Sequence, residues 1–240
     1  MSNLHIYTYG SDIARMDTLL QSIQINGINL NIRGHDREWQ GNIDKVSQLH
    51  TELASLPPED IFMFVDAYDV AIVSSEDEIL ETFHAYDAPF VISAEKPCWP
   101  DDHIRQYYPP CDSPYAFLNS GTYIGYVWAV LEYFDYCSQF EEYRVPTFDG
   151  IEQIPHAGSD QRCLTTWYLN HTDKAILDSE QRIFSTLAET PLESFELLAP
   201  NRIINLDTGH RTCVLHGNSA EGMLTLVRLW FRVRSLTIIK

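Results

Sequence analysis

The chain has 240 residues, of which 45% are hydrophobic and 21% are charged. These proportions are typical of a folded globular domain and exclude an intrinsically disordered chain. The 34 acidic and 16 basic residues give a formal net charge of −18, and a field of this sign repels nucleic-acid phosphates and anionic lipids. We therefore expect no strong nucleic-acid binding and no membrane partner.

The N-terminus and the cysteines indicate a compartment. The first residues, MSNLHIYTYGSD, lack the basic and long apolar regions of a cleaved signal peptide, and no apolar stretch approaches the roughly 18 residues that cross a bilayer. The five cysteines form no CxxC pair, which argues against a zinc knuckle or a redox motif. Cys98 and Cys111 can bridge in an oxidising compartment, but buried free thiols are the favoured interpretation. The sequence predicts a cytoplasmic protein.

Apolar periodicity and breaker residues predict strands and helices that alternate along the chain. In chain order, the expected elements are a strand at 4–9, a helix from about 12 to 26, a strand at 28–32, a helix ending near 56, a strand at 61–65, a helix at 76–84, strands at 90–93, 115–118 and 123–126, helices at 128–141 and 160–169, strands at 175–177, 202–205 and 213–215, and a last helix at about 220–233. Such alternation is typical of an α/β fold. No repeat or linker divides the chain, so we expect a single domain over 1–240.

Two loops stand out by their length. The segments at 95–114 and 143–158 are rich in proline, glycine and aromatic residues. Both are too long for simple connections. We interpret them as candidate substrate loops.

Two carboxylates, Asp66 and Asp69, directly follow the apolar run Ile61–Val65. A continuous apolar run is typical of a strand buried on both faces, and open α/β sheets bind ligands at the carboxyl ends of their strands. Residues i and i+3 of a turn lie within about 7 Å in Cα separation, so both side chains can reach one cation. Oxygen ligands favour Mg²⁺ or Mn²⁺. The alternative interpretation is a pair of ordinary turn and capping aspartates.

Short motifs follow one another in a fixed order along the chain. They are Asp66-Ala67-Tyr68-Asp69-Val70, Ser93-Ala94-Glu95 with Cys98-Trp99-Pro100-Asp101, Tyr108-Pro109, Leu118-Asn119-Ser120-Gly121 with Ile124-Gly125, Asp160-Gln161, Leu177-Asp178 with Ile183-Phe184, and His216-Gly217-Asn218. In this order they resemble the glycosyltransferase domain of the procollagen lysyl hydroxylases and the related collagen glycosyltransferase-like proteins. The resemblance extends to about Asn218 and implies a GT-A fold, a Rossmann-like mixed sheet flanked by helices.

The resemblance implies a nucleoside-diphosphate-sugar transferase and gives roles to the matching positions. Asp66, Asp69 and His216 match the family's metal ligands, for Mn²⁺ with Mg²⁺ as the alternative, and such an ion offsets the charge of a departing diphosphate. The positions that match the donor site are Thr8, Trp39, Lys45, Tyr68, Gly217 and Asn218. Each also has a structural alternative, such as a solvated helix lysine for Lys45 or a core histidine for His216.

On the acceptor side, the resemblance and the side-chain chemistry single out Glu95, Trp99, Asn119 and Asp160. Tryptophan faces pack on the apolar side of sugars, while carboxylates and amides bind hydroxyls. We assign Asp160 to an oxocarbenium-like centre, Asn119 to the donor sugar, and Glu95 with Trp99 to the acceptor. The sequence departs from the family at positions 158–159 and 122, where acidic residues and a second glycine are replaced by Gly-Ser and Thr.

The leading functional hypothesis is therefore Mn²⁺-dependent transfer of a hexose, glucose before galactose, from a UDP-sugar to a hydroxyl acceptor with retention. The acceptor is a protein, a glycan, a small molecule or a hydroxylated nucleobase. A metal-dependent hydrolase of phosphate esters or nucleotide sugars is the second hypothesis, but it needs a further ligand cluster that the sequence does not show. A non-catalytic nucleotide-sugar-binding module is the third, and it has little reason to keep all three metal positions.

Overall fold

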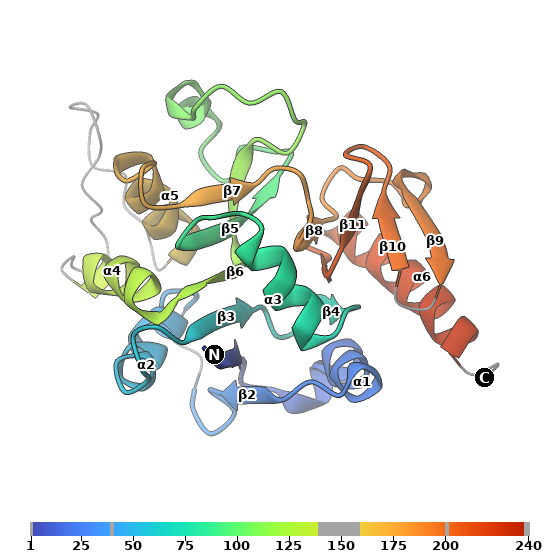
Figure 1. Ribbon diagram of the computed structural model, residues 1–240, viewed down its shortest axis with the longest axis horizontal. Coiled ribbons are helices and arrows are strands. Elements are labelled where there is room, and N and C mark those ends of the chain that lie inside the picture. Colours follow the sequence, from blue (N-terminus) through green and yellow to red (C-terminus); the bar gives the residue numbers. More distant parts are fainter. Residues whose placement is uncertain (1, 39–40, 139–158, 200–201, 238–240) are drawn as a thin grey trace.

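A computed structural model of the protein describes residues 2–38, 41–138, 159–199 and 202–237. Within these ranges the chain forms a mixed central sheet with helices on both faces (Figure 1). The α/β fold class expected from the sequence is confirmed. Trp39 and the expected loop at 143–158 lie outside the described residues.

The central sheet has six strands in the order β2-β1-β3-β6-β5-β7. Their bounds are β1 Leu4–Tyr9, β2 Leu30–Arg33, β3 Ile61–Val65, β5 Phe90–Glu95, β6 Phe117–Tyr126 and β7 Ile176–Asp178. Strand β6 is antiparallel to both of its neighbours, whereas the β1–β2, β1–β3 and β5–β7 pairs are parallel. The parallel strands β3 and β5 therefore end at one edge of the sheet, and that edge carries the site described below.

Successive side chains of β3 point to opposite faces of this sheet. Phe62 and Phe64 pack in a cluster with the helices α2, Asp44–Leu53, α4, Val127–Ser138, and α5, Asp160–Asn170. Ile61, Met63 and Val65 point to the opposite face, where they pack with α1, Asp17–Asn26, and α3, Glu76–His84. All five side chains are buried, so β3 lies at the centre of the hydrophobic core.

Two small sheets and a long helix complete the fold. One sheet has the order β4-β12-β8, and the other has the order β11-β10-β9. Their strands are β4 Val70–Ile72, β8 Phe184–Thr186, β9 Phe195–Ala199, β10 Arg202–Asn205, β11 His210–Thr212 and β12 Val214–His216. The long helix is α6, Ala220–Thr237, and the short 3₁₀ helices are η1 Ile13–Arg15, η2 Asp102–Tyr107 and η3 Leu192–Ser194. Helix α6 packs its buried side chains, Leu226, Leu229 and Val233 among them, against these sheets.

The structure differs from the expected elements mainly where pairing between distant segments determines the secondary structure. The two short strands expected at 115–118 and 123–126 form the single strand β6, because the Asn119–Gly121 segment between them stays in the sheet. The helix expected from about residue 12 begins as η1, which Asp12 caps by accepting a hydrogen bond from the Ala14 N–H at 3.0 Å. The strands β4, β8, β9 and β11 were not expected.

Two cysteines also differ from expectation. Cys137 in α4 and Cys163 in α5 form a disulfide, so the expectation of free thiols is wrong for this pair. Cys98 and Cys213 are free and buried, as the favoured interpretation has it, whereas Cys111 is free but exposed. The two bridged residues are 26 positions apart, and only the packing of α4 against α5 brings them together. Among the described helices, none has the length and apolar composition to span a membrane.

Candidate active site

A cavity of about 630 Å³ opens at the sheet edge where β3 and β5 end. It is lined by residues from eight separate parts of the chain, including Asp66, Glu95, Asn119, Asp160 and His216. The cavity therefore collects most of the side chains that the sequence singled out, although they lie as far apart in the chain as Lys45 and Asn218.

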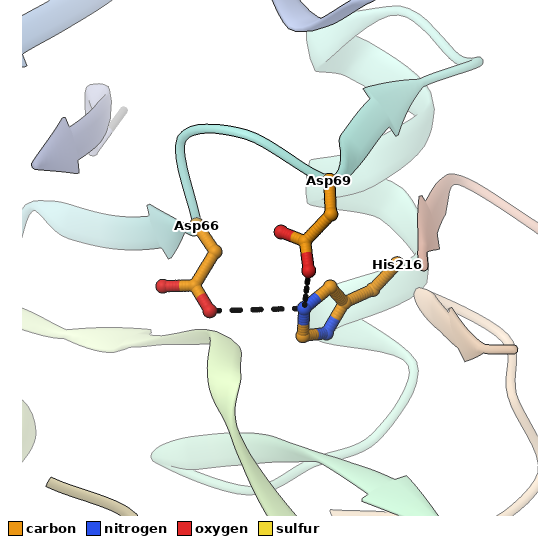
Figure 2. A group of neighbouring side chains, drawn as sticks. All are labelled: Asp66, Asp69 and His216. Carbon is orange, nitrogen blue, oxygen red and sulfur yellow. Dashed lines mark ion pairs between the residues drawn. The ribbon is translucent and has the colours of Figure 1, made fainter. Parts of the chain in front are cut away.

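Three metal-ligating side chains converge in this cavity. Asp66 follows β3, Asp69 precedes β4, and His216 ends β12 (Figure 2). The Nε2 atom of His216 lies 3.4 Å from Oδ2 of Asp69 and 3.7 Å from Oδ2 of Asp66. One ligand atom from each residue lies within 4.8 Å of the others, and this is the one such group of three within the described ranges. The expected metal ligands thus come together at a spacing that one cation can bridge.

Backbone contacts hold the three ligands in place. The N–H of Asp66 donates to the carbonyl of Gly121 at 2.8 Å, which fixes the end of β3 against β6. The N–H of Gly217 donates to the carbonyl of Asp69 at 2.7 Å, beside the antiparallel pair of Val70 with His216. The acidic turn is therefore fastened on both sides by the sheet hydrogen bonds.

Electrostatics within the group favour a charged histidine. Burial alone would lower the pKa of His216, but the charges of Asp69 and Asp66 outweigh it and raise the pKa above its usual value. Burial would likewise raise the pKa of Asp69, yet the neighbouring His216 outweighs it and lowers the pKa of that carboxyl. Burial raises the pKa of Asp66 against the opposing charge of Lys45. A cation at this position would take over the role of the histidine proton.

Lys45 lies between two carboxylates. Its Nζ atom is 2.9 Å from Oδ1 of Asp66 and 2.8 Å from Oδ2 of Asp160, and the side chain is only 6% exposed. Burial would lower the pKa of Lys45, but Asp160 and Asp66 outweigh it and raise the pKa well above the usual value. The sequence placed Lys45 on the nucleotide side of the site, and the structure gives its ammonium two protein partners that join the metal group to Asp160.

Glu95 and Asn218 both line the cavity and are hydrogen-bonded to each other. The Nδ2 atom of Asn218 donates to Oε2 of Glu95 at 2.5 Å, and its Oδ1 atom accepts the N–H groups of Leu187 and Ala188 at 3.0 and 2.9 Å. Burial raises the pKa of Glu95 to about 8. The Asn218 amide is therefore largely engaged by the protein, although the residue lines the cavity as expected.

Asn119 occupies an irregular part of β6. Its Oδ1 atom accepts the N–H of Gly121 at 3.0 Å, and its carbonyl accepts the hydroxyl of Ser93 at 3.0 Å. Asn119, Asp160 and Trp99 all line the cavity. The indole of Trp99 is 61% exposed, which leaves a face free for a ligand on the side that the sequence assigned to the acceptor.

Three expected donor-site residues lie elsewhere. Thr8 is fully buried in β1. The Tyr68 hydroxyl accepts the N–H of Asp12 at 3.0 Å, and the Arg15 guanidinium lies 4.7 Å over its ring. Gly217 packs on α6, where an added Cβ would meet Met223 Cα at 3.1 Å. None of the three is among the cavity's described lining residues, so they stay predictions as donor contacts.

Some cavity residues had no role in the sequence predictions. Glu189, Ser219 and Glu221 line the cavity near the start of α6, but no pattern in the sequence marks them. Gln161 appeared only as part of a motif, and it is buried against the cavity wall. Its signal was its place next to Asp160 at the start of an expected helix.

Comparison with known proteins finds relatives that match most of this chain. The PLOD GT domain family matches residues 2–229. The multifunctional procollagen lysine hydroxylase and glycosyltransferase LH3 of Rattus norvegicus is 34% identical over 218 residues, which are 83% of this chain and 27% of that protein. The procollagen-lysine,2-oxoglutarate 5-dioxygenase of Drosophila melanogaster is 30% identical over 220 residues, which are 83% of this chain and 28% of that protein. The chain therefore spans little more than a quarter of the length of these two relatives.

A solved structure shows the fold. The crystal structure of a glycosyltransferase involved in the glycosylation of the major capsid of PBCV-1 superposes with a TM-score of 0.52, covers 95% of this chain and 99% of its own, and is 9% identical. At this identity the likeness concerns the fold alone. The fold is the GT-A fold that the sequence resemblance implied.

Proposed function

The chain belongs to the PLOD GT domain family, and on this premise we propose that it is a Mn²⁺-dependent hexosyltransferase. It takes the sugar, glucose before galactose, from a UDP-sugar and transfers it to a hydroxyl acceptor with retention of the anomeric configuration. Family and fold support a nucleotide-sugar glycosyltransferase. The observation that carries the finer proposal is the convergence of Asp66, Asp69 and His216 in a cavity of suitable size.

The donor atoms of this group fit a divalent ion. Two carboxylates and one imidazole form a set that suits Mn²⁺, and the nitrogen ligand favours it over Mg²⁺. Gly121 leaves the space beside His216 and Asp66 free of any side chain. When bound, the ion would offset the charge of the diphosphate as it leaves the sugar.

The remaining side chains divide between the two substrates. Asp160 and Lys45 lie on the metal side of the cavity, so the Asp160 carboxylate is suited to stabilise positive charge at the sugar carbon. Asn119 orients the donor sugar, and Glu95 with the exposed Trp99 faces the acceptor hydroxyl. The names of these two relatives refer to procollagen lysine, so a hydroxylysine peptide is the first acceptor to test.

The metal site is tested by calorimetry of UDP binding. We expect UDP to bind in the presence of Mn²⁺ and to lose affinity by about 10²-fold in Asp69→Asn, because the variant removes a charged ligand. Asp173→Asn is the matched control, since Asp173 is exposed and does not line the cavity. Equal UDP affinity in Asp69→Asn and in the control would overturn the metal site.

The reaction is tested by release of UDP from a panel of UDP-sugars with Mn²⁺, with and without the hydroxylysine peptide. Transfer predicts release that rises with the acceptor and a product of retained configuration by NMR. Release to water alone would favour the hydrolase, and Mn²⁺-dependent binding without release would favour a binding module.

The cytoplasmic location stays a prediction, and the Cys137–Cys163 disulfide argues against it, because oxidising compartments favour such bonds.

A further inference from the structure

The strand β6 leaves its regular pairing next to the cavity. On β5 the register runs from Ile92 to Ala94, while on β6 the partners are Tyr123 and Leu118. The additional residues of β6, which include Asn119 and Gly121, therefore form a bulge that takes their backbone groups out of the β5 ladder. Buried backbone donors and acceptors at such a bulge need other partners.

The side chain of Gln161 supplies two partners at this bulge. Its Oε1 atom accepts the N–H of Ser120 at 2.6 Å, and its Nε2 atom donates to the carbonyl of Leu118 at 2.6 Å. The two contacts flank Asn119 on both sides, as a neighbouring strand would. Gln161 is 4% exposed, so water does not replace these bonds easily.

The same amide reaches the acceptor side of the cavity. The Nε2 atom of Gln161 lies 3.1 Å from Oε1 of Glu95 and 3.2 Å from the carbonyl oxygen of Trp99. Four parts of the chain thus meet at one side chain: the bulge of β6, the end of β5, the loop that carries Trp99, and the first turn of α5. Only a group that both donates and accepts can link α5 to the other three parts, which excludes a carboxylate or an apolar residue at this position.

We propose that Gln161 is a positioning residue that fixes Asn119, Glu95 and Trp99 relative to Asp160, and so sets the geometry of the acceptor half of the cavity. The inference rests on the proposed glycosyl transfer. Gln161 makes no described contact with Asp66, Asp69 or His216, so its effect falls on transfer to the acceptor and not on the metal-dependent binding of UDP.

The test compares Gln161→Met and Gln161→Glu with wild type. Met keeps the length of the side chain but makes none of the hydrogen bonds. Glu keeps an acceptor for Ser120 and loses the two N–H donors that the acceptors on Leu118, Trp99 and Glu95 share. The matched control is Gln24→Met, because Gln24 is exposed on α1 and does not line the cavity.

Two measurements separate positioning from a general loss of structure. We expect kcat/KM for the hydroxylysine peptide to fall by about tenfold to a hundredfold in both variants, while the Kd of UDP with Mn²⁺ and the release of UDP to water change less than about threefold. Hydrogen exchange read by mass spectrometry should become faster at Ser120 and in the peptide that contains Trp99, with the exchange of β3 unchanged.

The outcomes distinguish this inference from the proposed function. Unchanged transfer in both variants, or an equal loss of UDP affinity and transfer, would overturn the positioning role. Wild-type protein that shows no Mn²⁺-dependent UDP binding and no transfer would overturn the proposed function instead. In that case the exchange at Ser120 and at the Trp99 loop still decides whether Gln161 holds these segments.

Discussion

Gly121 lies so close to His216 that no side chain fits between them. A Cβ atom on Gly121 would stand 2.1 Å from Cε1 of His216 and 2.6 Å from Oδ2 of Asp66. The glycine of the Leu118-Asn119-Ser120-Gly121 motif therefore keeps open the space in which the metal ligands converge. This gives a physical reason for a residue that a sequence motif alone presents as a turn former.

The first prediction follows from this contact. Gly121→Ala should displace His216 or Asp66 and lower Mn²⁺-dependent UDP affinity by at least about tenfold, since a shifted ligand weakens the metal site. Gly125→Ala is the comparison, because its Cβ would meet the Pro89 carbonyl at 2.9 Å and so affects stability away from the metal group. Calorimetry and thermal unfolding of both variants separate the two effects. Wild-type UDP affinity in Gly121→Ala would show that the metal does not occupy this space.

The second prediction concerns Lys45, whose ammonium group lies between Asp66 and Asp160. Lys45→Met leaves a buried and a half-buried carboxylate without their partner, which should cost about 3 kcal/mol of unfolding free energy in a chelator. Mn²⁺ should restore part of this loss by neutralising Asp66, so the rise in Tm on adding Mn²⁺ should be larger than in wild type.

Lys174→Met is the matched control for Lys45→Met. Lys174 pairs with Glu132 at 2.6 Å, but both side chains are about 40% exposed, and an exposed pair contributes roughly 0 to 1 kcal/mol. Equal losses in the two variants would show that the Lys45 contacts add little. A larger loss of affinity for UDP than for uridine in Lys45→Met would support the phosphate role that the sequence suggested.

The elements that sequence reasoning predicted best carry their signals locally. The strand β3 is an uninterrupted apolar run, and α3 begins with a capping box in which Ser75 and Glu78 satisfy each other's backbone N–H groups. The strands β4, β8 and β11 have three residues each, too few for any periodicity. These strands form by pairing with other strands, and no local sequence pattern predicts that pairing.

The site residues also divide into those with a local sequence signal and those that depend on long-range packing. Asp66 and Asp69 were recognisable from a strand and a turn, whereas His216 entered only through the family resemblance, because its antiparallel strand pair lies far away in the sequence. The polar Asn119–Gly121 segment looked like a break between two strands. It stays in β6 because Ser93 and Gln161 bind its backbone, and these partners depend on tertiary packing.

The third prediction tests Asp160. Asp160→Asn keeps the shape of the side chain but removes its charge, so turnover should fall by about 10²-fold, equivalent to about 2.7 kcal/mol of transition-state stabilisation. The Kd of UDP should change little, because Lys45 keeps its contact with Asp66. Asp101→Asn is the matched control. Asp101 pairs at 2.7 Å with Arg162, which lies on the same helix as Asp160. Asp101 does not line the cavity. Normal turnover in Asp160→Asn, or an inverted linkage in the product, would contradict the assignment.

The fourth prediction uses the buried carboxyl of Glu95. Burial raises its pKa from 4.5 to about 8, so the folded protein binds more protons than the unfolded chain between these values. The stability that this group contributes is therefore fully present below the unfolded pKa and is lost as the pH rises through the folded one. In a chelator, the wild-type free energy of unfolding should fall over this window, by about 1.4 kcal/mol for each pH unit at this site.

Glu95→Gln should remove this dependence, because the amide resembles the protonated acid in shape and does not titrate. Urea unfolding at about pH 5.5 and about pH 8 should show the variant gaining about 3 kcal/mol relative to wild type across the interval. Glu59→Gln, at an exposed glutamate, is the matched control for the same chemical change. If the stability curves of Glu95→Gln and wild type run parallel from acid to alkaline pH, Glu95 does not keep its proton at neutral pH in the folded protein, and its role toward the acceptor would be that of a carboxylate throughout.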